Sequence, residues 1–127
     1  MADIEADETG KAPRDVIVEQ KRIARADAIA FVFPLFWWGM PAMTKGWVDR
    51  TWSWGWAYDQ LDDPNISLQR PRTGLFLVPS GARSDEMDKT GYAAAIRTTW
   101  LDGTFGYFGF AKREIIFLNG SKGSDDR

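Results

Sequence analysis

The feature that most constrains the fold is an uninterrupted apolar run from Ala28 to Phe33, which Pro34 ends. A strand with one face in water alternates apolar and polar residues, whereas this run is apolar at every position. Such a pattern is typical of a strand buried on both faces, as in parallel sheets. Residues 73–78 and 114–118 form two similar short runs. The sequence therefore predicts three strands of a parallel sheet.

Helical patterns at residues 15–26, 42–53 and 92–101 alternate with these strands. Asp15 is the expected N-cap of the first helix. The alternation predicts an α/β fold in which right-handed crossovers join parallel strands and helices cover both faces of the sheet.

Ligands of such sheets bind beyond the carboxyl ends of the strands. Three loops follow the predicted strands and are candidates for this role, residues 34–40, 79–90 and 119–123. Glycines at 103, 106 and 109 are expected to break up the chain between the last helix and the last strand.

The length of 127 residues fits one domain, residues 1–127, with a loose N-terminal arm at 1–12 and a loose tail at 119–127. The net charge of −2 argues against a nucleic-acid binder. The acidic N-terminus does not resemble a signal peptide, and the longest apolar stretch is too short to span a membrane.

The sequence contains no cysteine and no histidine. Their absence excludes thiol and imidazole catalysis and Cys/His metal sites, so we expect no metal centre. Any chemistry must use carboxylates, Lys, Tyr or a bound cofactor. A cysteine-free chain is also consistent with a cytoplasmic protein.

Six of the seven tryptophans lie between Trp37 and Trp56. Trp47 and Trp52 fall on the second predicted helix, where packing in the core is the simpler interpretation. Trp37 and Trp38 fall in the loop after the first strand. There we favour the interpretation that they form one wall of a binding site for a flat ring.

The run from residue 31 to residue 50, FVFPLFWWGMPAMTKGWVDR, resembles the flavodoxin-like NAD(P)H:quinone oxidoreductases, as do Gly55-Trp56-Ala57-Tyr58, Gly91-Tyr92 and residues 108–110. The resemblance covers about residues 14–120. It implies a flavodoxin-like, doubly wound parallel sheet. It also implies an enzyme that binds FAD or FMN, takes hydride from NAD(P)H and passes it to a quinone-like acceptor.

The resemblance also implies site residues. The first loop would line the edge and face of the isoalloxazine, and the second would offer amides to its pyrimidine edge. The resemblance places Trp38 and Tyr58 in the acceptor pocket. By the chemistry of the phenol, Tyr58 and Tyr92 are the candidate catalytic groups, because they can hydrogen-bond an acceptor carbonyl as negative charge develops. The cofactor residues so implied are Pro34, Leu35, Phe36, Trp37, Trp38, Gly39, Ser80, Gly81 and Ala82.

The sequence departs from the family before Asp15, where the first strand, phosphate loop, helix and second strand of the family have no counterpart, and after Asn119, where its last helix is missing. The three predicted strands then correspond to strands 3, 4 and 5 of a truncated flavodoxin-like sheet. The strand at residues 28–33 becomes an exposed edge, which predicts a homodimer or a covering chain. The alternative function is a catalytically silent fragment or assembly partner that retains the isoalloxazine-facing surface without holding the cofactor.

Overall fold

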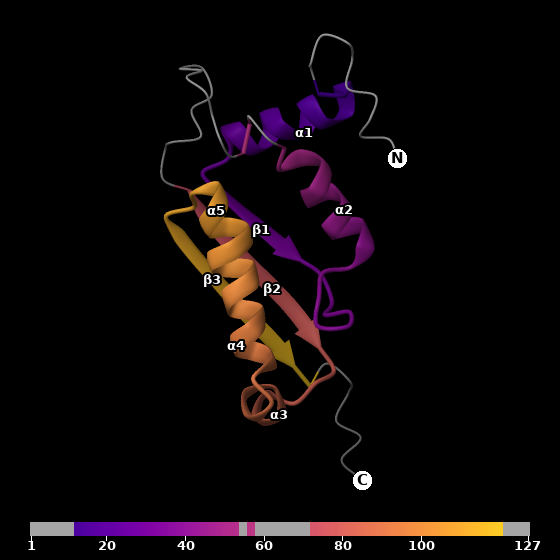
Figure 1. Cartoon of the computed structure of the whole chain (residues 1–127), viewed down its shortest axis with the longest axis vertical. Helices are drawn as coiled ribbons and strands as arrows, with labels where there is room; N and C mark the ends of the chain where they lie inside the picture. Colours follow the sequence, from indigo (N-terminus) through magenta and orange to yellow (C-terminus); the bar gives the residue numbers. More distant parts are fainter. Residues whose placement is uncertain (1–11, 54–55, 58–71, 121–127) are drawn as a thin grey trace.

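The computed structural model describes residues 12–53, 56–57 and 72–120 (Figure 1). Three strands alternate with helices along the chain. The elements are α1 (Arg14–Arg25), β1 (Ala28–Val32), α2 (Ala42–Thr51), β2 (Thr73–Ser80), α3 (Ser84–Lys89), α4 (Tyr92–Ile96), the π-helix η2 (Arg97–Phe105), α5 (Gly106–Phe108) and β3 (Lys112–Asn119).

The strands form one parallel sheet in the order β1-β2-β3. Phe31 of β1 lies beside Phe76 of β2, which lies beside Ile115 of β3. These three side chains point to the same face and are buried. The three-stranded parallel α/β sheet predicted from the sequence is confirmed.

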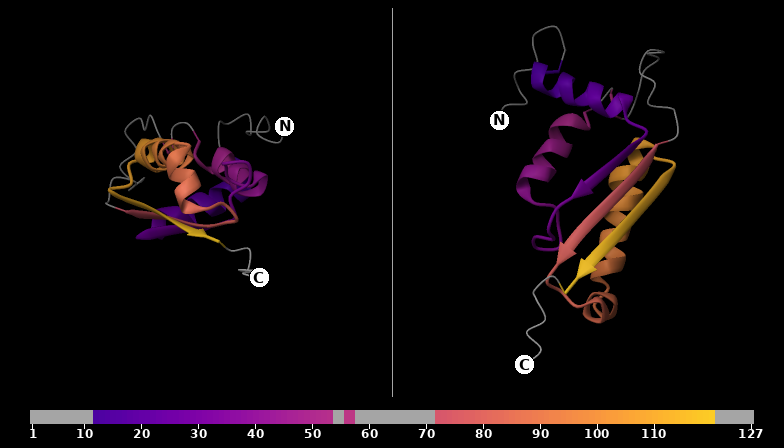
Figure 2. Two further views of the ribbon diagram at one scale, coloured as in Figure 1. Left: turned by 90° about the horizontal axis from the view of Figure 1, so that it is seen from below. Right: turned by 180° about the vertical axis from the view of Figure 1, so that it is seen from behind.

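The helices, however, lie on one face of this sheet, so the expectation of helices on both faces is wrong for the described residues. Figure 2 shows α2 and the α4–α5 helix on the same side, with the strands uncovered when seen from behind. The reason is topological. Strand order advances in one direction, and successive right-handed crossovers in one direction place every connecting helix on the same face. A reversal of strand order is needed to reach the other face.

The core between sheet and helices is built largely from aromatic rings. Phe76 is fully buried and stacks on Phe105 of η2 with ring centroids 4.3 Å apart. The backbone approaches this ring closely at Gly74, where a Cβ atom would lie 2.6 Å from the Phe105 ring. Trp47 and Trp52 are partly buried and pack against the same cluster, in line with the core interpretation.

Several element boundaries differ from the expectations. Residues 84–89 form α3 rather than loop. The helix from Tyr92 runs through Gly103 and Gly106 to Phe108 and ends at Gly109, whose φ of 97° terminates it. Asn119 belongs to β3 rather than to a loose tail, and its amide donates to the Ser84 hydroxyl at 2.7 Å.

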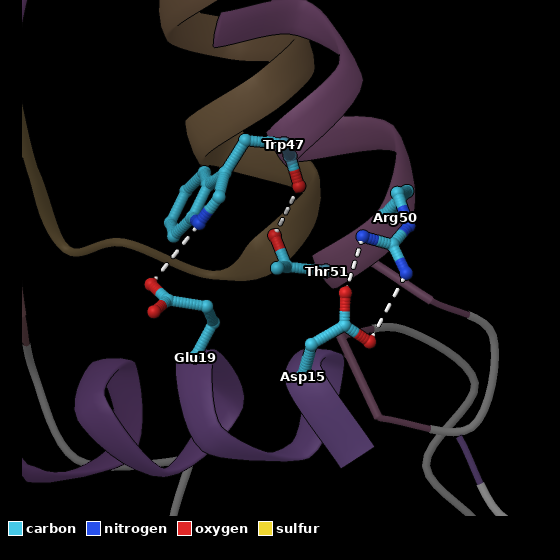
Figure 3. A network of polar contacts seen from close by, with 5 residues as sticks. All are labelled: Asp15, Glu19, Trp47, Arg50 and Thr51. Carbon is cyan, nitrogen blue, oxygen red and sulfur yellow. Dashed lines mark hydrogen bonds and ion pairs between the residues drawn. The ribbon is translucent and has the colours of Figure 1, made fainter. Parts of the chain in front are cut away.

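A polar network joins α1 to α2 (Figure 3). Arg50 donates to both oxygens of Asp15 at 2.6 and 3.1 Å, and the Trp47 indole donates to Glu19 at 3.1 Å. The residue that precedes α1 as its cap is Pro13, not Asp15. Asp15 is therefore not the N-cap; it lies in the first turn, where a carboxylate is favoured by the helix dipole and here also by Arg50.

We expect the Asp15–Arg50 pair to make folding stability depend on pH in acid. The hydrogen bond from Arg50 holds the pKa of the Asp15 carboxyl below its ordinary value. A lowered folded-state pKa stabilises the fold above the unfolded-state pKa of about 4 and loses that contribution as pH falls through the folded-state value. Asp15→Asn should therefore lower the melting temperature near pH 7, and the difference should be smaller at about pH 3, measured by circular dichroism. An equal difference at both pH values would contradict this coupling.

Candidate flavin-ring site

Two loops meet where β1 and β2 end. Because the strands are parallel neighbours, their carboxyl ends lie at the same edge of the sheet. The Leu35 amide donates to the Pro79 carbonyl at 3.1 Å and ties the two loops together. Beside them lies a cavity of about 320 Å³ lined by Leu35, Trp38, Ser80, Gly81, Ala82, Glu86, Met87 and Tyr92.

The loop after β1 is a two-residue reverse turn. Phe36 and Gly39 exchange backbone hydrogen bonds of 3.1 and 2.9 Å. Trp37 and Trp38 occupy the two central positions with φ of 50° and 62°. Such turns favour Asn and Gly there, because left-handed backbone crowds a Cβ atom. Residues in strained backbone conformations cluster at functional sites, so the conformation of this turn favours a functional role for the loop.

We expect Trp37→Asn to stabilise the protein. Asparagine tolerates the left-handed conformation, and its introduction should raise the unfolding free energy by ~1 kcal/mol. The Trp37 side chain is 93% exposed, so its removal loses little burial. Thermal unfolding of the variant and the wild type measures the difference, and a lower melting temperature in the variant would show that the turn is not strained.

The five predicted cofactor residues that line the cavity are Leu35, Trp38, Ser80, Gly81 and Ala82. Ser80 is buried, and its hydroxyl accepts a hydrogen bond from the Ala82 amide at 3.0 Å. That amide is therefore engaged within the loop. The hydrogen bond between the Ala82 amide and the Ser80 hydroxyl thus stabilises the conformation of the loop after β2, where it lines the cavity.

The other predicted site residues differ in whether they line the cavity. Tyr92, at the start of α4, lines the cavity and contacts Trp38 edge to face with ring centroids 4.9 Å apart. The remaining residues of the first loop lie beside the cavity without lining it; they are Pro34, Phe36, Trp37 and Gly39. Tyr58 lies outside the described residues.

Sequence reasoning did not single out Glu86 and Met87, which complete the cavity. Both lie on α3, in the stretch that the sequence pattern indicated as a loop. The run 84–89 is polar apart from one methionine, and Met87 is the residue of this helix that is buried. A helix of six residues offers too few positions for a helical period to appear in the sequence.

The cavity fits a flat aromatic ring. Leu35, Trp38, Met87 and Tyr92 give it apolar and aromatic walls, whereas Ser80 and Glu86 are polar. Aromatic rings contribute large contact areas with defined edge and face geometry, which suits a planar ligand. Of the residues known to line the cavity, none is a lysine or an arginine. The described part of the wall thus suits a ring and lacks a cationic group for a phosphate.

The chain belongs to the flavodoxin-like fold family, which it matches over residues 1–127. Among curated proteins, it is 34% identical over 94 residues to ribosyldihydronicotinamide dehydrogenase [quinone] of Pongo abelii. That match covers 74% of this chain and 37% of the relative.

Two solved structures extend the comparison. The NAD(P)H:quinone oxidoreductase from Methanothermobacter marburgensis superposes with a TM-score of 0.78 at 32% identity, over 98% of this chain and 61% of that one. The general stress protein 14 from Treponema denticola, in complex with FMN, gives a TM-score of 0.69 at 25% identity, over 85% of this chain and 62% of that one.

The chain thus spans between about one third and two thirds of the length of these proteins. The flavodoxin-like fold expected from the sequence resemblance is confirmed. In the described part of the chain, every helix is too short or too polar to cross a membrane.

Proposed function

We propose that this protein is an NAD(P)H-dependent flavin oxidoreductase of the quinone-reductase type. The observation that carries the proposal is the cavity at the carboxyl ends of β1 and β2, walled by Trp38 and Tyr92. The names of its relatives support it: quinone reductases that use NAD(P)H or ribosyldihydronicotinamide, and a structural neighbour in complex with FMN.

A bound FAD or FMN would supply the hydride chemistry itself. The residues of this chain would bind and orient the ring. Trp38 and Leu35 would contact it, and the backbone around Gly81 would face its polar edge. These roles require no titratable group, which agrees with a chain that has no histidine or cysteine.

Tyr92 is the described candidate for contact with the acceptor. Its phenol hydroxyl can donate a hydrogen bond to a quinone-like carbonyl as negative charge develops there. Tyr58 is proposed for the same role on the evidence of the sequence resemblance. NAD(P)H and the acceptor would bind in turn at the open side of the cavity. We also propose a cytoplasmic location for the protein.

A second candidate function is a catalytically silent assembly partner. It is favoured by the absence of a cationic group among the known residues of the cavity wall and by the unpaired side of β1 in the described sheet. In either case a further chain over β1, a second copy or a different protein, is part of the proposal, because an open apolar edge strand tends to pair.

Anaerobic spectroscopy separates the two candidates. The purified chain is mixed with FMN or FAD, and the flavin absorbance near 450 nm is followed after NADH or NADPH is added. The enzyme predicts bleaching faster than in the flavin-only control, followed by recovery when a quinone is added. An absence of flavin binding supports the silent partner and rejects the enzyme. Flavin binding without accelerated bleaching contradicts the reductase activity.

A further inference from the structure

We propose that Glu86, which lines the ring cavity, makes this cavity bind planar cationic rings more tightly than planar anionic rings of the same size. The inference names the class of ring and acceptor that the cavity takes, so it rests on the proposed function. Its test measures ring binding by the chain without flavin, which separates its failure from a failure of the reductase activity.

Glu86 is the charged residue of the cavity wall. Among the described residues that line the cavity, it alone carries a formal charge. The side chains around it are apolar or neutral, such as Leu35, Trp38 and Tyr92. These groups supply no counter-charge to the carboxylate, so the described wall presents a net negative charge to a bound ring.

The backbone of Glu86 is fixed because α3 is anchored on both sides of this residue. Met87 is 3% exposed and packs in the core. The Asn119 amide donates to the Ser84 hydroxyl at 2.7 Å and ties the start of α3 to the end of β3. At the other end of α3, the Thr90 amide and hydroxyl donate to the Glu86 carbonyl at 3.0 and 2.8 Å. The Glu86 side chain therefore extends from a fixed point of the cavity wall.

The cations nearest to Glu86 in the sequence leave its charge largely uncompensated. The Arg83 guanidinium donates to both oxygens of Asp85 at 3.1 and 3.4 Å. The hydrogen bond to Asp85 is the largest cause that raises the pKa of Arg83, whereas the charge of Glu86 makes the smallest contribution. Lys89, in the last turn of α3, forms no ion pair with Glu86 within the described part of the chain.

The size of the effect depends on screening. Glu86 is exposed, and water and salt weaken the action of an exposed carboxylate on a nearby charge. A ring that enters the cavity displaces water from its walls, which strengthens the interaction again. We therefore expect a preference for the cation of about fivefold or more at low ionic strength, which decreases as salt is added.

The class of acceptor follows from this charge. Neutral quinone-like rings and cationic heteroaromatic rings, such as phenothiazinium and pyridinium rings, are compatible with a carboxylate beside them. Sulfonated or carboxylated quinones would place a second negative charge near Glu86 and should bind more weakly.

Two tricyclic dyes, similar in size to the isoalloxazine, are the probes. Thionine is a planar cation and resorufin a planar anion at neutral pH, and both are fluorescent. Fluorescence anisotropy therefore gives the dissociation constant of each dye from the full chain. The wild type should bind thionine about fivefold or more tightly than resorufin, and Glu86→Gln should reduce this ratio by about threefold or more.

Asp88→Asn is the matched control. It removes the same charge from the same short helix, at an exposed residue that does not line the ring cavity. Its ratio of dissociation constants should differ from that of the wild type by less than about 1.5-fold, because an exposed charge outside the cavity is screened from the ring.

Three results would overturn the proposal. They are equal changes of the ratio in the two variants, the absence of a preference for thionine in the wild type, and the binding of neither dye. If the chain reduces flavin with NAD(P)H but binds both dyes equally, this inference fails and the proposed function stands. If the preference depends on Glu86 in a chain that does not accelerate flavin bleaching, this inference stands and the reductase activity is rejected.

Discussion

Phe76→Ala should remove most of the stability of this protein. Phe76 lies on the central strand, is fully buried, and contacts four other rings, Phe31, Phe33, Trp100 and Phe105. Truncating a buried phenylalanine costs ~3–5 kcal/mol, because burial is lost and a cavity remains. Since a domain of this size has a total stability of ~5–15 kcal/mol, the loss is a large fraction of it.

Urea unfolding followed by tryptophan fluorescence measures this effect. The midpoint should fall strongly, with an unchanged slope if the variant still unfolds in one step. Tyr107→Ala is the matched control, because its ring is 73% exposed and its loss should cost less than ~1 kcal/mol. Equal losses in the two variants would contradict the assignment of the core.

Trp38→Ala should weaken the binding of a flavin ring by roughly fivefold to a hundredfold. The ring of Trp38 is the aromatic wall that the turn after β1 contributes to the cavity. Stacking of a flat heterocycle on an aromatic side chain contributes ~1–3 kcal/mol when measured by alanine substitution. The change is measured by the quenching of flavin fluorescence on titration with protein.

Trp37→Ala is the control for this variant. It changes the same residue type in the same turn, and Trp37 does not line the cavity. Its flavin affinity should stay within about twofold of the wild type. A loss as large as that of Trp38→Ala would show that the turn moves on binding and that Trp37 also contacts the ring.

The sequence patterns predicted the architecture well, because the apolar strands and amphipathic helices carry strong local signals. The run from Ala28 to Phe33 and the pattern around Phe76 each marked a strand that the structure contains. The one-sided helix layer was not predictable from alternation alone, since alternation does not specify strand order. The order β1-β2-β3, without a reversal among the described strands, decides that only one face is covered.

The site was predicted in part. Resemblance and topology together pointed to the loops at the carboxyl ends of β1 and β2, and Trp38 and Ser80 do meet at one cavity. The left-handed conformation of Trp37 and Trp38 was not visible in the sequence, because neither residue is a usual choice for such a turn. Met87 was missed because a six-residue helix offers too few positions to show a period.

The same turn links stability to function. Two tryptophans in left-handed backbone cost stability that Asn and Gly would not cost, and in the proposed ring site the indole of Trp38 would contact the flavin. A chain selected for stability alone would not retain this pair. The strain therefore supports a role for the loop in binding.

We propose that the described residues form the ring wall of a flavin site and that the known residues of this wall include no lysine or arginine to hold the phosphate. Fluorescence titration with riboflavin, FMN and FAD tests this directly, because the three share the ring and its ribityl chain and differ in the phosphate and nucleotide. We predict that the chain binds all three with dissociation constants within about threefold of one another. Tighter binding of FMN or FAD than of riboflavin by a factor of about ten or more, or no binding of riboflavin, would rule out this arrangement.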